Sequence, residues 1–177
     1  MRRALPALAA LLLIPAANAE KADLTKPWEI EAGRMSADDA RRMTIFEGGV
    51  VVTRGTMRLL ADRLVVRQDA EGFQFATATG KPARFRQRQD AKPPDTEGQW
   101  MEGEAQRMEI DDRSGKVELF DNAHVKRGGD EVAGNYILLD QRSDFFSVST
   151  GKNGKDATPA GRVKATIQPK PRQPEAK

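Results

Sequence analysis

Residues 46–66 read Phe-Glu-Gly-Gly-Val-Val-Val-Thr-Arg-Gly-Thr-Met-Arg-Leu-Leu-Ala-Asp-Arg-Leu-Val-Val, and this stretch decides the fold. Aliphatic and β-branched side chains alternate with polar ones in Val50–Thr53 and in Met57–Val66, which is the pattern of half-buried strands. The turn between them contains Gly55, a residue that reaches positive φ without a Cβ clash. The pattern therefore predicts a β-hairpin. Because an isolated hairpin is barely stable in water, further strands must join it.

The chain repeats this pattern at a constant offset of 73 residues. Glu31–Asp39 and Glu104–Asp112 both read Glu-Ala-x-Arg-Met-x-x-Asp-Asp, and Arg54-Gly55 falls on Arg127-Gly128 at the same offset. Apolar positions also match along it. Agreement of this kind predicts a tandem duplication of a β-rich unit, with repeats at about residues 28–88 and 100–168. The segment Gln89–Gly98, which contains two prolines and several charges, is expected to connect them.

The N-terminus has the features of a secretory signal peptide. Arg2-Arg3 is followed by the apolar run Ala4–Ile14 and by the Ala17-Asn18-Ala19 cleavage motif. The run is shorter than the roughly 20 residues that span a bilayer, so cleavage is favoured over a retained membrane anchor. We therefore predict that residues 1–19 are removed and that the exported, soluble chain begins at Glu20.

Composition excludes several classes of protein. The formal net charge is +3, and it falls to about +1 once Arg2 and Arg3 are removed, so the sequence pI of 9.3 overstates the basicity. The net positive charge comes from the C-terminal region, where residues 169–177 are expected to form a disordered, Pro-rich basic tail. The export signal argues against nucleic acid as a partner. Without cysteines, the domain must be held by its hydrophobic core, with neither disulfides nor thiol catalysis.

Short alternating segments separated by turn signals continue through the chain, and they predict an all-β sandwich, jelly roll or barrel. Helical periodicity is weak outside the signal peptide, although Ser36–Met43 is long enough for one helical turn. A turn is expected at Thr79–Pro82. Further strands are expected at Trp28–Ala32, Phe73–Thr77, Ala83–Arg86, Glu104–Ile110, Lys116–Phe120, Ala123–Arg127, Glu131–Asp140, Phe145–Ser149 and Gly161–Gln168.

Residues that could carry catalysis are few. His124 is the only histidine, so neither a His-based triad nor a multi-His metal site can form within one chain. It lies in an alternating segment, which favours a surface or packed position over a functional one. The pairs Asp38-Asp39 and Asp111-Asp112 lie beside predicted turns, where Asp bonds to its own backbone, and this is favoured over a metal or acid–base role. We expect no enzyme activity, no metal and no cofactor.

Apolar side chains line one face of the predicted strands in each half. This pattern has two interpretations that periodicity alone does not separate. The face forms an ordinary sandwich core, or the two faces close incompletely and leave an apolar groove for acyl chains. The residues are Trp28, Ile30, Val50, Val52, Met57, Leu59, Phe73, Phe75, Phe85, Met108, Ile110, Leu119, Val125, Val132, Ile137, Leu139, Phe146 and Val148.

Four motifs resemble one known family. They are Pro27-x-x-Ile30-Glu31-Ala32; Phe46-x-Gly48-x-Val50-x-Val52-Thr53-x-Gly55-Thr56-x-x-Leu59-x-Ala61-Asp62-x-Leu64-x-Val66; Gly80-Lys81-Pro82-Ala83-x-Phe85-x-Gln87; and Asn122-Ala123. Together they are similar to the OstA-like, or LptA, family of periplasmic lipopolysaccharide-transport bridge proteins. The resemblance extends from about Pro27 to Phe146, behind the signal peptide.

The resemblance implies an open, twisted β-jellyroll of consecutive antiparallel strands in the periplasm, whose apolar interior holds the acyl chains of lipopolysaccharide. By position, the lipid-facing residues of the family fall on Trp28, Ile30, Phe85 and Ile110. With the strand pattern, the predicted lipid-binding set also includes Val50, Val52, Leu59, Phe75, Met108, Val125 and Ile137. The implied partners are an inner-membrane-anchored OstA-like protein, an outer-membrane β-barrel translocon and further copies of the chain, stacked head to tail.

Two residues depart from the family pattern. Asp112 replaces an apolar inward residue after Ile110, so the groove ends sooner or the turn begins earlier. Asp121 replaces the glycine of the second Gly-Asn pair, which Asp tolerates at a turn. The leading hypothesis is a non-catalytic lipid-transport bridge. The alternatives are a stand-alone periplasmic lipid carrier, the anchored partner of the same pathway, or a β-rich structural module that binds no lipid.

Overall fold

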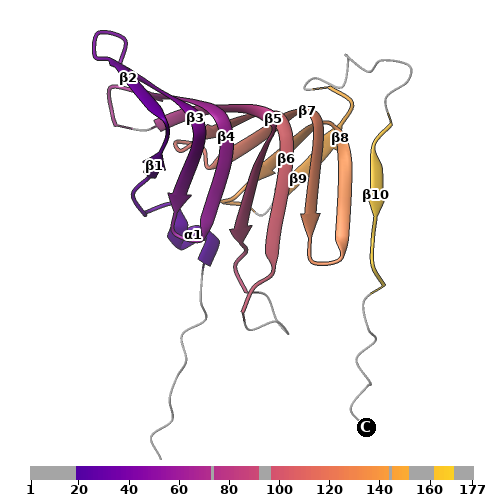
Figure 1. The fold of residues 1–177 in the computed structure, drawn as a ribbon. Helices are drawn as coiled ribbons and strands as arrows, with labels where there is room; N and C mark the ends of the chain where they lie inside the picture. The colour runs from indigo at the N-terminus through magenta and orange to yellow at the C-terminus, as the bar shows by residue number, and fades with distance from the viewer. Residues whose placement is uncertain (1–18, 73, 92–96, 144, 152–161, 170–177) are drawn as a thin grey trace, which may run out of the picture.

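A single antiparallel sheet dominates the computed structural model, which describes residues 19–72, 74–91, 97–143, 145–151 and 162–169 (Figure 1). Most of the predicted signal peptide, Phe73 and residues 170–177 of the predicted tail lie outside the described residues. A short helix, α1 (Ala19–Asp23), precedes the sheet. The strands are β1 (Glu29–Glu31), β2 (Arg34–Asp38), β3 (Met43–Arg54), β4 (Met57–Gln68), β5 (Gln74–Arg88), β6 (Trp100–Asp111), β7 (Lys116–Arg127), β8 (Asp130–Asp140), β9 (Phe145–Ser149) and β10 (Lys164–Thr166).

Strands β3 to β8 follow one another in the sheet in chain order, each antiparallel to the next. At one edge, β1 and β2 both pair with β3, and at the other edge β9 and β10 both pair with β8. Within the described residues the sheet stays open, because these two edges do not pair with each other. The predicted open jellyroll of consecutive antiparallel strands is confirmed. The central turn also forms as predicted, with Gly55 at a φ of 58°.

Each pair of long strands shifts register near its midpoint. In β3 the shift lies between Glu47 and Val50, where Gly48 and Gly49 have φ values of 85° and 68°. In β7 it lies between Phe120 and Ala123, where Asp121 and Asn122 have φ values of 64° and 53°. Asp and Asn adopt this left-handed conformation more readily than most residues. Asp121 therefore adopts the left-handed conformation that glycine has in the family pattern. It does so in a β-bulge, whereas the sequence predicted a turn.

The row of shifts bends the sheet, because an extra residue kinks a strand and increases its twist. It divides every long strand into two halves. The lower half lies on the side of the turn between β7 and β8 in Figure 1 and includes the ends of β3 and β7 at Arg54 and Arg127, and the other half is the upper one. One hydrophobic cluster contains inward residues of both halves, so the sheet folds over onto itself as two layers. The lower layer contributes Val50, Val52, Leu59, Ala61, Ala83, Phe85, Met101, Ala105, Ala123 and Val125. The upper layer contributes Leu64, Ala76, Ala78, Met108, Ile110, Val117, Leu119, Ile137 and Leu139.

Three sequence expectations were wrong. Thr79–Pro82 is not a turn, because β5 continues through it. The pairing with β6 is interrupted between Thr79 and Ala83, where the register shifts. Lys116–Phe120 and Ala123–Arg127 are one strand for the same reason. Ser36–Met43 holds no helical turn: its first residues belong to β2 and the next form a turn. The last strand is shorter than expected, covering Lys164–Thr166, and residues 152–161 lie outside the described part.

A buried polar network joins the free ends of the two layers. Gln141, just after the upper end of β8, donates its side-chain amide to Gln87 Oε1 in the lower half of β5, over 2.7 Å. Gln87 in turn donates to Asp23 Oδ2 over 3.0 Å, and Asp23 also accepts from the backbone N–H and the hydroxyl of Thr56. Asp23, Gln87 and Gln141 are each less than a tenth exposed. Because the Asp23 carboxylate accepts three hydrogen bonds, the network closes the seam between the layers without an unsatisfied carboxylate.

The carboxylate of Asp23 lies against the Gly55 turn, which predicts a large effect of a small substitution. A Cβ on Gly55 would lie 1.9 Å from Asp23 Oδ1. Gly55→Ala therefore incurs the left-handed backbone cost of about 1 to 2 kcal/mol and also displaces Asp23. Loss of hydrogen bonds to this charged group lowers the free energy of unfolding by about 2 kcal/mol more.

Gly49→Ala is the matched control, because Gly49 has a similar φ and nothing lies within 4 Å of its hypothetical Cβ. Urea denaturation of both variants measures the difference. Equal losses of stability would contradict a role for Asp23 in closing the seam.

Candidate functional site

The inner faces of the two layers bring together ten of the eleven residues predicted to bind lipid. Eight belong to the buried cluster, and Trp28 and Ile30 are partly buried against it at the N-terminal edge of the sheet. The eight are Val50, Val52, Leu59, Phe85, Met108, Ile110, Val125 and Ile137. Their side chains share one continuous apolar interior, as the alternation predicted.

Phe75 is the exception. It pairs with Arg67 and Asp111, whereas its neighbour Ala76 pairs with Val66 and Ile110 on the inner face. Phe75 therefore lies on the outer face, and it is 36 % exposed. The sequence predicted that the larger apolar side chain, Phe75, would point inward. In the structure the small side chains of Ala76 and Ala78 occupy the inner face instead. The structure therefore does not place Phe75 with the other ten.

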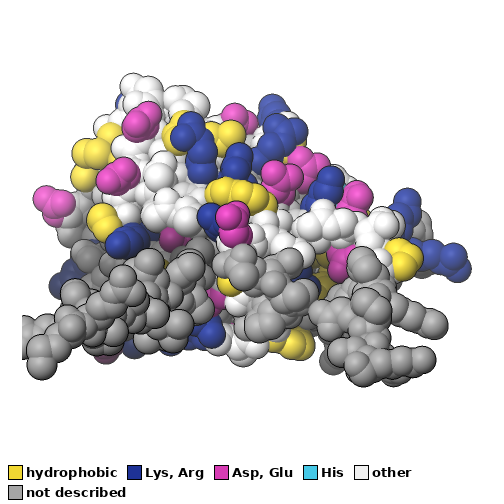
Figure 2. Space-filling model, turned by 90° about the horizontal axis from the view of Figure 1, so that it is seen from below, with side chains coloured by type: hydrophobic (Ala, Val, Ile, Leu, Met, Phe, Trp, Pro, Cys, Tyr) yellow, Lys and Arg dark blue, Asp and Glu magenta, His cyan; other side chains and the backbone are white. Residues whose placement is uncertain are grey.

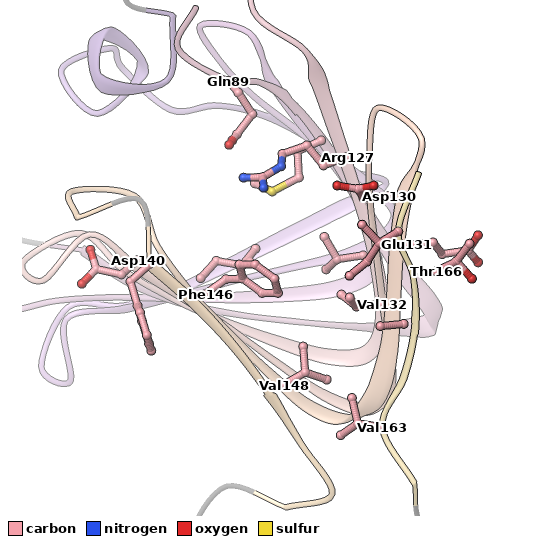
Figure 3. Close-up of a pocket in the computed structure, with 16 residues that line it drawn as sticks. Gln89, Arg127, Asp130, Glu131, Val132, Asp140, Phe146, Val148, Val163 and Thr166 are labelled. Atoms are coloured by element: carbon pink, nitrogen blue, oxygen red, sulfur yellow. The ribbon is translucent and has the colours of Figure 1, made fainter. Parts of the chain in front are cut away.

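Open space in the interior lies at the C-terminal end, where a cavity of about 420 Å³ separates the layers (Figure 3). Its wall on the lower side comes from β8 and β10, and its wall on the upper side from the end of β8 and from β9. Of the eleven residues predicted to bind lipid, only Val125 lines this cavity. The lining residues are Gln89, Met101, Val125, Arg127, Asp130, Glu131, Val132, Leu139, Asp140, Phe145, Phe146, Val148, Val163, Ala165, Thr166 and Ile167.

The mouth of this cavity carries exposed apolar side chains. Phe145 is 55 % exposed, Phe146 is 43 % exposed and Ile167 is 77 % exposed. Phe145 and Phe146 belong to β9, and Ile167 directly follows β10. These two strands are the last of the described sheet, so no further described strand covers the three residues there. Large exposed apolar groups gathered at one place are typical of a binding surface rather than of an ordinary protein exterior.

Asp140 lies on the rim of the cavity. Burial raises the pKa of its carboxyl, but hydrogen bonds from the side chain and backbone of Ser143 and from the backbone of Arg142 outweigh this and hold the pKa below its ordinary value. Its carboxylate caps the turn between β8 and β9, and is therefore engaged in structure.

In the N-terminal half, a buried ion pair closes the seam. Arg54, at the lower end of β3, donates to Asp112 Oδ1 over 2.5 Å, and Asp112 lies just beyond the upper end of β6. Arg54 also donates to the carbonyls of Leu24 and Lys26, and its guanidinium lies 5.4 Å from the centre of the Trp28 ring. Asp112 thus replaces an apolar residue because it binds Arg54 across the seam, at the point where the turn after β6 begins.

Polar groups outside the groove have structural roles. Asp38 accepts from the backbone N–H of Arg41, and Asp111 accepts from those of Arg113 and Ser114, which confirms the turn interpretation of both acidic pairs. His124 lies on the outer face and bonds to Glu131 over 2.5 Å. In Figure 2, basic and acidic side chains intermingle over the described surface, with smaller hydrophobic groups between them.

Within the described ranges, no group of three or more His, Cys, Asp or Glu residues could hold a metal ion. None of the described helices has the length and apolar character needed to cross a membrane.

Comparison with known proteins gives the family. Residues 29–145 match the family described as LptA/(LptD N-terminal domain) LPS transport protein. The chain belongs to this family. It is 32 % identical to the lipopolysaccharide export system protein LptA of Escherichia coli K12, over 78 % of this chain and 81 % of that protein. It is 27 % identical to LptH of Pseudomonas aeruginosa, over 84 % and 82 % of the two chains.

A crystal structure of LptH, described as the LptA-homologous periplasmic component of the lipopolysaccharide transport device of Pseudomonas aeruginosa, superimposes with a TM-score of 0.72. The match covers 84 % of this chain and 99 % of that one, at 26 % sequence identity. The LptA-like jellyroll is therefore the fold of this chain as well.

Sequence reasoning missed the polar residues that line the interior. Gln87 and Gln89 continue the inward phase set by Ala83 and Phe85, so their periodicity could have revealed them as buried polar groups. In the sequence, Asp112 is distinguished only as a departure from the family pattern. No local signal reveals its partner Arg54, because the two residues come from strands that lie three apart in the sheet.

The Arg54–Asp112 pair predicts a large loss of stability when one partner is removed. Asp112→Ala leaves a guanidinium, whose side chain is 8 % exposed, without its anion. We expect the free energy of unfolding to fall by about 3 kcal/mol, measured by denaturant titration. Asp62→Ala, at an exposed carboxylate of β4, is expected to change stability by less than about 0.5 kcal/mol. If the two variants were equally stable, the ion pair would not hold the seam.

Proposed function

We propose that this protein carries lipopolysaccharide through the periplasm by holding its acyl chains between the two layers of the sheet. Family membership carries this proposal, because the relatives are named as lipopolysaccharide export proteins and LptH as a periplasmic component of the transport device. The interior supports it. A continuous apolar face ends in a cavity whose mouth is apolar and open. Each buried methylene gains about 0.8 kcal/mol, so acyl chains need no charged pocket to bind firmly.

The role is non-catalytic in this proposal, and the first 19 residues act as a cleaved export signal. The interior of the sheet supplies apolar contacts for acyl chains. A stand-alone carrier and a membrane-anchored partner of the same pathway would use the same groove, and they differ from a bridge only in assembly and in retention of the N-terminus.

Photocrosslinking tests the groove. Photoreactive residues at Trp28, Ile30, Phe85 and Ile110, which lie on the inner face, are expected to capture lipopolysaccharide during export. Residues at Glu29, Phe75 and Arg86, which point outward, are expected to capture little. The readout is the lipopolysaccharide-linked fraction on immunoblots. Equal capture at inward and outward positions, or a protein that takes up no lipopolysaccharide after delipidation, would reject the groove and favour a structural module.

The two edges of the sheet support head-to-tail assembly. At the N-terminal edge, β1 has three residues against the lower layer and β2 has five against the upper layer. At the C-terminal edge, β10 has three residues in the lower layer and β9 has five in the upper layer. Edges of equal length, each with unpaired backbone groups, can add to one another. Assembly of this kind would continue both layers and the groove between them.

Exposed apolar residues at these edges allow the assembly to be tested. Met35, on β2, is 62 % exposed, and Ile167, beside β10, is 77 % exposed. We expect the unmodified protein to form a concentration-dependent series of oligomers, because a head-to-tail contact need not close. Met35→Asp and Ile167→Asp should each yield mostly monomer in light scattering. Mixed together they should form dimers only, since each retains one intact edge.

Leu60→Asp, at a 42 % exposed residue of the central strand β4, is the control and should leave the oligomer series unchanged. A protein that stays monomeric at high concentration would favour the stand-alone carrier. Mixed variants that remain monomeric would show that the two edges do not bind each other.

A further inference from the structure

Five charged or amide side chains line the C-terminal cavity: Gln89, Arg127, Asp130, Glu131 and Asp140 (Figure 3). The rest of the lining is mainly apolar. Whether a partner already engages each polar group therefore decides what kind of ligand the cavity accepts.

All three carboxylates are engaged. Asp130 Oδ1 accepts from the backbone N–H of Gln168 over 2.9 Å, which holds the chain beside β10. Glu131 pairs with His124 on the outer face. Asp140 Oδ1 accepts from the backbone N–H groups that follow it, over 3.0 and 3.1 Å. The acids therefore stabilise the walls of the cavity.

Gln89 is not satisfied. The residue is only 8 % exposed, and its Nε2 is buried with no hydrogen-bond partner among the described residues. Gln87, two positions earlier on the same inward phase, has partners for both its amide groups. A buried donor without an acceptor is costly and uncommon in a native protein. Other atoms of Gln89 line the cavity, so rotation of the amide on ligand binding would bring this donor to an acceptor there.

Arg127 provides a cation beside this donor. It ends β7, and within the described residues it forms no ion pair; its guanidinium lies 6.0 Å from the centre of the Phe146 ring. Figure 3 shows Gln89 and Arg127 on the same side of the cavity, with Phe146, Val132 and Val148 beyond them. One cation, with the Gln89 amide beside it, therefore faces an apolar floor.

We propose that Gln89 and Arg127 form a subsite for an anionic oxygen, of a phosphate or a carboxylate, on an amphiphile whose acyl chain lies over Val132, Phe146 and Val148. The inference rests on the proposed function only for the binding of the chain. Arginine favours such groups because its planar fork donates two hydrogen bonds to one anion. The amide of Gln89 adds a third donor, which becomes satisfied only when the ligand binds. The subsite makes the C-terminal end of the groove favour amphiphiles with an anionic headgroup over those with a neutral or cationic one.

Amphiphiles that share a dodecyl chain test this. Calorimetric titration of the full mature chain would use dodecyl phosphate, dodecanoate, dodecyl maltoside and dodecyltrimethylammonium, each below its critical micelle concentration. The two anions are expected to bind about tenfold more tightly than the neutral maltoside, and the cation is expected to bind most weakly. Comparison of phosphate with carboxylate identifies the preferred anion.

Gln89→Leu and Arg127→Met are each expected to reduce the preference for the anions, and the double variant to abolish it, while the affinity for dodecyl maltoside is retained. Arg58→Met, at an exposed arginine of β4 on the outer face, is the matched control and should keep the full preference. Thermal melts monitored by circular dichroism verify that each variant is folded.

A second measurement does not depend on any variant. The side-chain amide resonance of Gln89 in the unmodified protein should shift with dodecyl phosphate and much less with dodecyl maltoside. Equal affinities for anionic and neutral ligands, an unchanged preference in the double variant, or no selective shift of this resonance would overturn the subsite. If none of the dodecyl ligands binds, acyl-chain binding itself fails, and the proposed function fails with it.

Discussion

The row of register shifts across the middle of the long strands is the constraint on which the structure depends. A flat antiparallel sheet forms a single layer, so the two halves of its strands cannot pack their apolar faces against each other. Here the bulges bend every long strand, so its two halves form facing layers of one core. The shifts also change the phase of the alternation. In β5 the inward residues are Ala76 and Ala78 above the shift, but Ala83 and Phe85 below it. Without that change, one layer would turn polar side chains inward.

Folding the sheet in this way creates a seam, and polar contacts determine where the seam is closed. Arg54–Asp112 joins β3 to the end of β6, and Gln87–Gln141 joins β5 to the end of β8. Each contact connects strands that lie three apart, so the two layers are offset along the sheet. The lower halves of β7 and β8 would face strands three further along the sheet, and no described strand lies there. The end of the sheet therefore stays open, and the cavity forms there.

The strands and the inner face were largely predictable from sequence, because alternation is local and its phase is set by the residues themselves. The hairpin around Gly55, the extent of β9 and the inward positions Val50, Val52 and Leu59 illustrate this. The failures have one physical origin. A bulge looks like a turn in sequence, as at Thr79–Pro82, and it also changes the phase on its far side, as for Phe75. Contacts across the seam, such as Asp112 with Arg54, depend on the fold of the whole sheet and carry no local pattern.

The divided edges of the sheet have a mechanical consequence. Within the protein, the long strands that pair with one another are 11 to 15 residues long, and both layers share one core. A junction through the edges would contain only the three residues of β1 or β10 in one wall and the five of β2 or β9 in the other. A series of such units would be stiff inside each link and compliant between links. When the distance between its two anchoring points changed, it would flex at the joints, while the interior of every link kept its shape.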